Sequence, residues 1–311
     1  GDDVHLRGLV EISNYCARQC AYCGIRVGNS DVTRYRMTAD EVMECVHSAV
    51  QFGYGTTVLQ AGEDRGLTTE WVADLVRRIK QETPLAVTLS LGERPESDYA
   101  AWREAGANRY LIRFETSDRA LYERIHPSLP GQTSDRIAIL RTLRRLGYEA
   151  GSGIMVGIPG QTYESVANDL LLFRELDLDM IGVGPYLPHP ATPLGREYEN
   201  MLPEDEQVPN TEQMTQIVLA LTRLLCPQAN LPSTTALATV NQENGRELAL
   251  QRGANIVMPN LTPVKYRALY EIYPSKACIS ETAEACRQCL RGRILSIGRS
   301  VGTGPGGRRR S

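Results

Sequence analysis

Two hydrophobic patterns alternate along the chain. Short apolar runs, which are typical of strands buried on both faces, lie at 5–13, 56–62, 86–92, 109–115, 151–158, 180–188, 232–237 and 255–260. Segments with apolar residues at helical spacing lie at 39–52, 69–82, 96–105, 117–125, 133–147, 162–177, 211–226, 243–252 and 263–272. Thr38 and Ser117 precede acidic residues and are suited to cap two of these helices.

The regular alternation of strands and helices predicts an α/β protein with a complete (β/α)8 TIM-type barrel. An open, doubly wound sheet is the alternative, and the count of predicted strands favours closure. No low-complexity linker divides the chain. We therefore expect one domain over residues 1–311, with the barrel core at about 5–261 and a C-terminal extension or cap at about 262–311.

Charge and hydropathy narrow the range of partners. The formal net charge is −3, which provides no general basic field for nucleic acid. No apolar run approaches the ~20 residues that span a bilayer, so we expect no membrane partner. The chain opens with neither a signal peptide nor a Met, so we expect a cytoplasmic protein that lacks an N-terminal segment. The basic, glycine-rich stretch at 301–311 is expected to contact the bottom of the barrel or a partner.

Six of the eight cysteines fall in two triplets. The triplets are Cys16, Cys20 and Cys23, spaced C-x3-C-x2-C, and Cys278, Cys286 and Cys289, spaced C-x7-C-x2-C. Clustered cysteines in a reducing compartment indicate metal or redox chemistry rather than a disulfide framework. The remaining two, Cys45 and Cys226, lie in helical patterns and are interpreted as small buried apolar residues.

The first triplet follows the first predicted strand, where a barrel places its active site. Structural zinc needs four ligands, and the nearest histidines, His5 and His47, lie outside this loop. A [4Fe–4S] cluster can be held by three thiolates, which leaves one iron open to an exchangeable ligand. The three cysteines therefore favour an iron–sulfur cluster. For the second triplet, an iron–sulfur cluster and a zinc ion completed by a distant ligand both stay open.

The spacing of Cys16, Cys20 and Cys23, with Tyr22 before the third cysteine, resembles the signature of the radical S-adenosylmethionine (SAM) superfamily. The resemblance implies a [4Fe–4S] cluster on these three cysteines, with the amino and carboxylate groups of SAM on the fourth iron. It also implies an external electron donor and reductive cleavage of SAM to a 5′-deoxyadenosyl radical. In such an enzyme the protein binds and orients the cofactors that carry the chemistry.

By the same resemblance, cofactor contacts fall at predicted strand ends. The residues are Tyr22, Gly62, Glu63, Glu115, Arg136 and Met180. "AGED" (61–64) resembles a Gly-Gly-Glu strip that meets the methionine amino group, with Ala in place of the first Gly. Arg136 would pair with the methionine carboxylate, and Glu115 would accept from the ribose or the methionine. From pattern alone, a solvated loop position is the alternative for Glu63, and a core position explains Met180 equally well. For Arg136, the pattern alone favours a helix-surface position.

Longer motifs resemble a narrower group, the HydE family of [FeFe]-hydrogenase maturases, which is related to PylB and biotin synthase. The markers include "VLQAGED" (58–64), "MVGIPGQT" (155–162), "IGVGPYLPHPATPL" (181–194) and the C-terminal triplet. This resemblance implies a role in building the diiron subcluster of the H-cluster. The adenosyl radical would attack a cysteine-ligated Fe(CO)2(CN) precursor, received from the maturase HydG and passed toward HydF.

A small organometallic or amino-acid-derived substrate of this kind requires a cavity that tolerates anions. The expected lining residues are Arg109, Arg113, Thr235, Ala236, Met258 and Tyr270. Core or cap packing is an equally good interpretation of Met258 and Tyr270. The resemblance gives the second triplet an auxiliary iron–sulfur cluster that varies among members and is not catalytic.

Three other functions match parts of the same pattern. A PylB-like methylornithine synthase, which rearranges lysine, is the main alternative; the C-terminal triplet argues against it. Biotin synthase takes ligands for its second cluster from inside the barrel strands, where no further Cys occurs. A non-catalytic iron–sulfur electron carrier needs no cavity, whereas carboxylates and arginines gather at the predicted strand ends.

Overall fold

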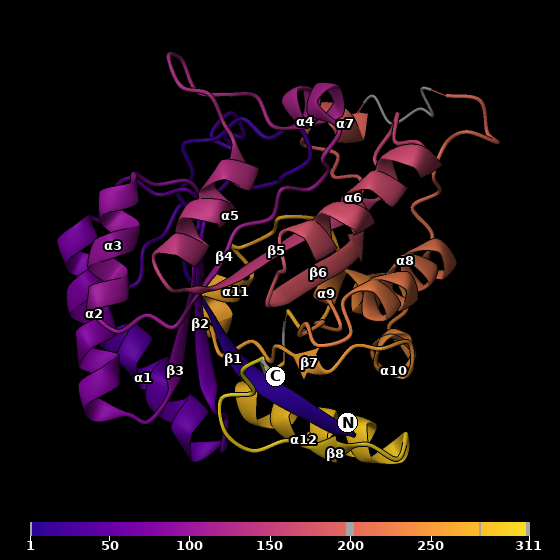
Figure 1. Ribbon diagram of the computed structural model, residues 1–311. Coiled ribbons are helices and arrows are strands. Elements are labelled where there is room, and N and C mark those ends of the chain that lie inside the picture. The colour runs from indigo at the N-terminus through magenta and orange to yellow at the C-terminus, as the bar shows by residue number, and fades with distance from the viewer. Residues whose placement is uncertain (1, 197–201, 280, 309–311) are drawn as a thin grey trace.

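A computed structural model describes residues 2–196, 202–279 and 281–308 (Figure 1). Parallel strands form a curled sheet in the order β6-β5-β4-β3-β2-β1-β7, and β8 pairs with the start of β1. The strands are β1 (Asp3–Ser13), β2 (Thr56–Ala61), β3 (Ala86–Ser90), β4 (Arg109–Leu111), β5 (Glu149–Val156), β6 (Met180–Pro185), β7 (Ile256–Val257) and β8 (Ser300–Val301). Seven of them lie at the places where the apolar runs predict strands.

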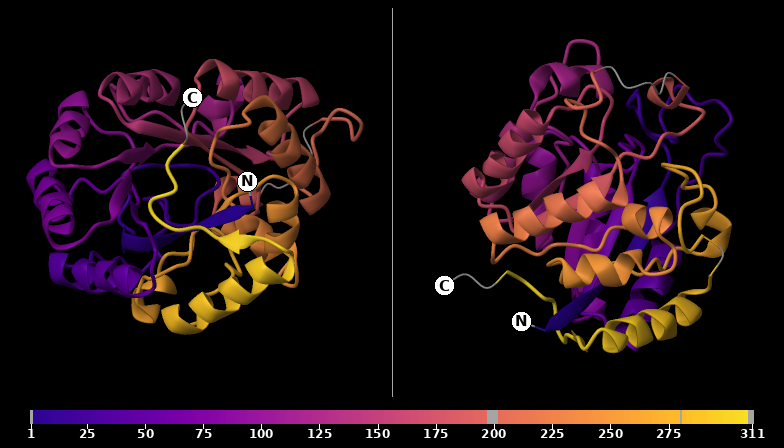
Figure 2. Two further views of the ribbon diagram at one scale, coloured as in Figure 1. Left: turned by 60° about the horizontal axis from the view of Figure 1, so that its bottom comes forward. Right: turned by 90° about the vertical axis from the view of Figure 1, so that its right-hand side faces the viewer.

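Helices follow the strands and cover the outer face of the sheet (Figure 2). They are α1 (Ala39–Gln51), α2 (Thr69–Glu82), α3 (Glu96–Glu104), α4 (Arg119–Ile125), α5 (Arg136–Arg145), α6 (Tyr163–Glu175), α7 (Pro193–Arg196), α8 (Glu212–Leu225), α9 (Thr235–Val240), α10 (Gly245–Gln251), α11 (Val264–Arg267) and α12 (Ala283–Ser296). Of these, α7, α9 and α12 were not predicted. Helix α12 buries only Cys286, Leu290 and Ile294, which is too weak a pattern to stand out. No helix in the described residues is long and apolar enough to cross a membrane.

The predicted strand at 232–237 was wrong, because helix α9 begins at Thr235. The Thr234 side chain accepts from Leu237 N, so the Ser-Thr-Thr sequence caps a helix instead of extending a strand. Before it, Asn230 and Pro232 form single parallel bridges to β6 and β7. The fold is thus a curled seven-stranded parallel sheet, and a complete barrel of eight full strands stays a prediction.

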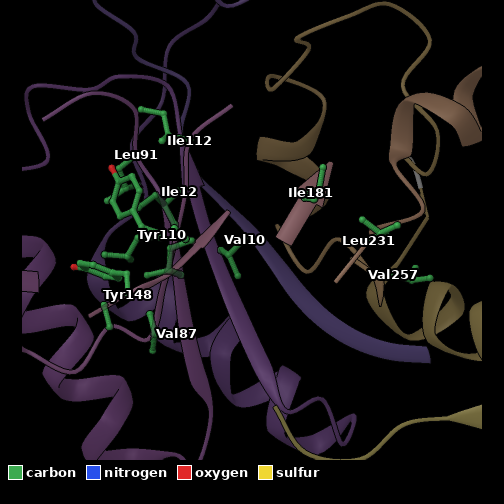
Figure 3. Packing of buried hydrophobic residues seen from close by; sticks show 14 of the residues in the cluster. Val10, Ile12, Val87, Leu91, Tyr110, Ile112, Tyr148, Ile181, Leu231 and Val257 are labelled. Atoms are coloured by element: carbon green, nitrogen blue, oxygen red, sulfur yellow. The ribbon is translucent and has the colours of Figure 1, made fainter. Parts of the chain in front are cut away.

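An aromatic cluster that includes Tyr110 and Tyr148 (Figure 3) joins the sheet to α3. The Tyr110 ring on β4 meets Tyr99 edge-on at 4.9 Å and stacks on Trp102 at 6.2 Å. Tyr148, just before β5, meets the other edge of Tyr110 at 6.0 Å. Such pairs each contribute about 0.5–1.5 kcal/mol beyond their buried area. They pack α3 against β4 and the start of β5, below the strand ends that carry the candidate site.

The C-terminal stretch crosses the amino-terminal ends of the strands (Figure 2). Pro305 O accepts from Thr56 Oγ1 at 3.0 Å and from Arg109 Nη2 at 3.3 Å. Gly306 O accepts from Arg7 Nη2 at 3.0 Å. Burial, and then the nearby Arg109 charge, lower the pKa of Arg7 to about 9. The expected contact with the bottom of the barrel is therefore found for residues 305 and 306, while 309–311 lie outside the described residues.

Candidate active site

The first cysteine triplet lies in the loop that follows β1, at the carboxyl-terminal end of the sheet. Three backbone N–H groups of this loop donate hydrogen bonds to neighbouring segments. The bonds are Ala17 N to Glu63 O, Ala21 N to Ile125 O and Gly24 N to Ile272 O. Gly62 permits the close approach, since a Cβ there would lie 2.2 Å from Tyr15 O. The loop is therefore held in place without regular secondary structure of its own.

Arg34 organises the loop from within. Its guanidinium donates to four backbone carbonyl oxygens, at Asn14 (2.6 Å), Ile25 (2.7 Å), Arg26 (2.8 Å) and Asn29 (3.3 Å). A charged donor with a planar fork satisfies carbonyls that a helix or strand would otherwise pair. The chain can thus bend around the cysteines with its backbone groups bonded.

A cavity of about 210 Å³ opens beside the cysteines. It is lined by ten of the residues that the sequence assigns to cluster, cofactor or substrate: Cys16, Cys20, Tyr22, Cys23, Gly62, Glu63, Arg113, Glu115, Arg136 and Tyr270. These residues come from the ends of β1, β2 and β4, from α5 and from the segment after α11. The structure brings them together although they span more than 250 positions in sequence.

Two arginines and two carboxylates form a buried network in the cavity wall. Arg18 pairs with Glu63 at 2.8 Å and with Glu93 at 2.9 Å, and Arg136 pairs with Glu93 at 2.9 Å. Glu63 is 3% exposed, so it is not a solvated loop residue. The Arg136 side chain is 10% exposed, which excludes the helix-surface interpretation. Both therefore carry buried charge at the site, where burial strengthens electrostatic interactions.

Glu93 is the centre of this network. Its Oε1 accepts from Ser134 Oγ at 2.7 Å and lies 3.0 Å from His126 Nε2. Burial opposes ionisation of Glu93, but the bond from His126 and the charges of Arg136 and Arg18 outweigh it, so its pKa is held well below the usual range. Burial, followed by the Arg136 charge, lowers the pKa of His126 to about 4.

Glu115 has an unusual backbone at the end of β4. Its φ is +62°, a region that side-chain-bearing residues rarely adopt, and it forms a bridge to Ile154. Arg113 Nε lies 3.1 Å from each carboxylate oxygen of Glu115, and Arg113 Nη2 donates to Ile154 O at 2.5 Å. Strained backbone of this kind collects at ligand sites, where surrounding contacts hold it.

Of the three thiols of the first triplet, Cys20 is buried, and Cys16 and Cys23 are half-buried. Burial raises the pKa of Cys20 to about 12, and it also raises the pKa values of Cys16 and Cys23. Without a metal these sulfurs therefore keep their protons at neutral pH. Metal binding deprotonates a coordinating thiol.

The donor set fits an iron–sulfur cluster with an exchangeable ligand. Three sulfurs that line one cavity match the thiolate preference of such clusters. Arg18 Nη1 is buried and has no hydrogen-bond partner among the described residues. Buried donors are normally paired, so this group leaves room for an acceptor such as a carboxylate. When bound, a cluster here would supply the electron that cleaves SAM.

Comparisons with known proteins identify the family. A model of the radical SAM superfamily matches residues 10–173, which is about half of the chain. The [FeFe] hydrogenase maturase subunit HydE of Thermotoga maritima is 45% identical over 310 residues, which cover 100% of this chain and 85% of the relative. The chain belongs to the HydE family.

Membership in the HydE family makes this protein a radical SAM enzyme and implies a [4Fe–4S] cluster and SAM. A 3-methylornithine synthase of Methanosarcina acetivorans is 31% identical over 83% of the chain and 69% of the relative. The crystal structure of the methylornithine synthase PylB superposes with a TM-score of 0.78 at 25% identity, over 97% of this chain and 84% of that one. A HydG structure, at 19% identity and a TM-score of 0.74, covers 96% of this chain and 64% of that one and shares the fold.

Two predicted site residues lie at the opposite end of the sheet. Arg109 begins β4 and pairs with Glu149 at 2.6 Å and with the C-terminal stretch. It precedes Arg113 by four residues, which places it ~13 Å along an extended strand. Met180 begins β6, and its sulfur accepts from Arg7 at 3.1 Å. The assignments of Arg109 to substrate and of Met180 to cofactor are therefore corrected: neither lines the cysteine cavity.

The remaining substrate candidates divide. Tyr270 is 2% exposed and lines the cavity, with its hydroxyl 3.3 Å from Gln60 Nε2. Thr235 and Ala236 lie in the first turn of α9, and Ala236 packs against Gly184 at the end of β6. Met258 follows β7 and is half-buried. Tyr270 thus lines the cysteine cavity, whereas Thr235, Ala236 and Met258 do not.

The second triplet has a different setting. Cys278 lies in a loop with φ +62°, and Cys286 and Cys289 lie on α12, beside a separate cavity of about 430 Å³. The sulfurs of Cys278 and Cys286 and a carboxylate oxygen of Glu281 lie within 4.8 Å of one another, whereas Cys289 is outside this group and exposed. The bond from Cys286, together with the Arg246 charge, lowers the pKa of Cys278 to about 6 despite burial.

Sequence reasoning missed Arg18, Glu93 and His126. Arg18 lies inside the C-x3-C spacing, and Glu93 ends the "SLGE" stretch after β3, so both had a positional indication. His126 ends α4 in "RIHP", and nothing in the pattern connects it with cysteines more than 100 positions earlier. Its role could be found only from the folded chain.

Proposed function

We propose that this chain uses SAM and a [4Fe–4S] cluster on Cys16, Cys20 and Cys23 to process a cysteine-ligated Fe(CO)2(CN) precursor of the diiron subcluster. The observation that carries the proposal is one cavity lined by the triplet, by the Arg113–Glu115 pair, and by Arg18, Glu63 and Arg136, which Glu93 joins from behind the lining. Family membership supports the hydrogenase context. HydG is proposed as the supplier of the precursor and HydF as the recipient of the product.

The residues at the cavity have distinct proposed tasks. Arg18 and Arg136 bind the SAM carboxylate, for which the unpartnered Arg18 Nη1 is available. Glu63 and Glu115 accept hydrogen bonds from the amino and ribose groups. Arg113 and Tyr270 face the substrate and supply a cation and a hydroxyl for its anionic ligands. The buried setting excludes water from the reacting groups.

The experiment is anaerobic reconstitution with iron and sulfide, followed by SAM, dithionite and a synthetic Fe(CO)2(CN)–cysteine complex. We expect 5′-deoxyadenosine to form while the complex is consumed. The decay of the carbonyl and cyanide infrared bands of the complex measures its consumption. Formation of 5′-deoxyadenosine without any change in the complex would reject the substrate while keeping the reaction class. Absence of 5′-deoxyadenosine in every arm would reject the whole proposal.

A second candidate is a lysine mutase that forms methylornithine. The relative from Methanosarcina acetivorans and the PylB fold favour it, although the identity to that relative is lower than to HydE. A parallel arm with lysine in place of the iron complex separates the two functions. Methylornithine in that arm would establish the mutase.

We also propose that the second triplet binds a metal that is not needed for SAM cleavage. Cys278, Glu281 and Cys286 offer two sulfurs and an oxygen close enough to share one ion, and Arg246 stabilises the Cys278 thiolate. The auxiliary iron–sulfur cluster expected on all three cysteines requires Cys289 to turn inward. Elemental analysis of the unchanged chain against Glu281→Gln and Cys289→Ser distinguishes these ligand sets.

A further inference from the structure

The sulfur of Cys20 has a side-chain partner of a kind that Cys16 lacks. His126 Nδ1 lies 3.0 Å from Cys20 Sγ, and both residues are buried. The Cys16 sulfur instead accepts from two backbone N–H groups, of Arg18 at 3.5 Å and of Glu63 at 3.4 Å. Cys20 therefore contacts the imidazole of His126, a residue that belongs to none of the motifs.

Three contacts fix the imidazole of His126. Its Nε2 lies 3.0 Å from Glu93 Oε1 and 3.1 Å from Arg136 Nη2. Its ring packs on Tyr122 at 5.2 Å, and its backbone N–H closes the last turn of α4. Because the His126 side chain is 0% exposed, no water competes for the ring nitrogens. The orientation of Nδ1 toward the sulfur is therefore imposed by the protein.

The same geometry serves the sulfur with and without iron. A thiol at Cys20 can donate to Nδ1 while Nε2–H donates to Glu93. An iron-bound thiolate can only accept, and Nδ1–H then donates to it while Nε2 accepts from Arg136. A neutral imidazole can therefore bond the sulfur in both states by changing its tautomer. This is possible because Glu93 offers an acceptor and Arg136 a donor to the same nitrogen, Nε2.

We propose that His126 is a positioning residue that directs the Cys20 sulfur into the cavity and hydrogen-bonds it in the iron-bound form. This rests on the proposed cluster at the first triplet. Hydrogen bonds to cluster sulfurs tune reduction potentials, and groups that orient metal ligands typically contribute 10–100-fold in affinity or activity. A donor withdraws charge from the sulfur, so His126 makes reduction easier. Arg136, which contacts His126, would connect SAM binding with the same sulfur.

The test uses His126→Phe, which keeps a ring against Tyr122 but removes both nitrogens, and His126→Asn, which keeps an amide donor in reach of the sulfur. The reconstituted proteins are compared by iron content and by the midpoint potential of the cluster, without SAM. For His126→Phe we expect a roughly tenfold less favourable reduction equilibrium, which is about 59 mV lower for one electron. His126→Asn should recover most of the shift.

His47→Phe is the matched control. His47 also pairs with a glutamate, Glu82 at 3.2 Å, but it lies exposed on α1 and should leave the potential unchanged. Equal potentials and equal iron content in the unchanged protein, His126→Phe and His126→Asn would overturn the inference. If His126→Phe does not fold, a potential in His126→Ala equal to that of the unchanged protein has the same meaning. If the unchanged protein binds no four-iron cluster, the proposed function fails together with the inference.

Discussion

The two cysteine triplets use the same residue type and opposite environments. The first lies in an arginine-organised loop at the strand ends, where burial keeps all three thiols protonated. The second is divided between a loop and α12, with one thiol poised for ionisation and one exposed. Both have the C-x2-C step, so spacing alone does not separate them. The difference lies in what surrounds the sulfurs: the first triplet shares a cavity with a charged network suited to a cofactor, and the second faces a glutamate and an arginine.

The largest effect is expected from Cys16→Ala. Removing one of three ligands leaves too few thiolates for the cluster, so SAM cleavage should fall by roughly 1000-fold or more. The measurement is 5′-deoxyadenosine formed after anaerobic reconstitution, with circular dichroism to confirm that the variant folds. Cleavage at more than a tenth of the original rate would remove the distinction between the triplets.

A second prediction concerns thiol reactivity in the metal-free protein. Alkylation needs the thiolate, which forms above the pKa, so at pH 7.5 Cys278 (pKa about 6) is largely ionised and Cys20 (pKa about 12) is not. Iodoacetamide should label Cys278 more than ~100-fold faster, and this rate should fall as the pH is lowered through about 6. Mass spectrometry of the peptides measures both rates. Equal labelling of the two cysteines would contradict the electrostatic contrast.

Arg136→Lys tests the charged network that only the first triplet has. Lysine keeps the charge but cannot form the planar fork that reaches both Glu93 Oε1 and Arg113 O. We expect the KM for SAM to rise about tenfold with a smaller change in kcat. Arg287→Lys, an exposed site on α12, is the matched control. An unchanged KM would show that Arg136 has no part in binding SAM.

The smallest effect is expected from Cys286→Ala. SAM cleavage should stay within about twofold of the unchanged enzyme, because Cys286 lies outside the active cavity. Metal bound at the second triplet should be lost, as measured by elemental analysis. A large loss of cleavage would mean that the two triplets are coupled. Lys276, which lies two residues before Cys278, forms a buried ion pair with Glu11 on β1. This contact would carry such coupling.

The sequence predicted the strands and their rim well and failed where local chemistry was ambiguous. Val58 and Leu59 lie in an apolar run that indicates only a strand. Thr234, in contrast, is as well suited to a strand as to a helix N-cap, and in the structure it caps α9. Arg109 and Arg113 share one face of the predicted strand, but Arg109 stands at its amino-terminal end, and its bond to the C-terminal stretch places it at the base of the sheet. His126 reaches Cys20 through folding alone. Periodicity predicts faces and ends, whereas pairing between distant segments follows from tertiary packing.

The base of the sheet has a consequence for how the chain acquires its fold. Asp3 pairs with Ser300, Gly306 O accepts from Arg7, and Pro305 O accepts from Arg109. During synthesis, β1 and the buried guanidinium of Arg7 leave the ribosome almost 300 residues before these partners do. Contacts of such sequence separation slow folding, because the entropy of loop closure is lost before they form. Closure of the base is therefore expected as the last folding event, after the carboxyl-terminal rim has taken shape.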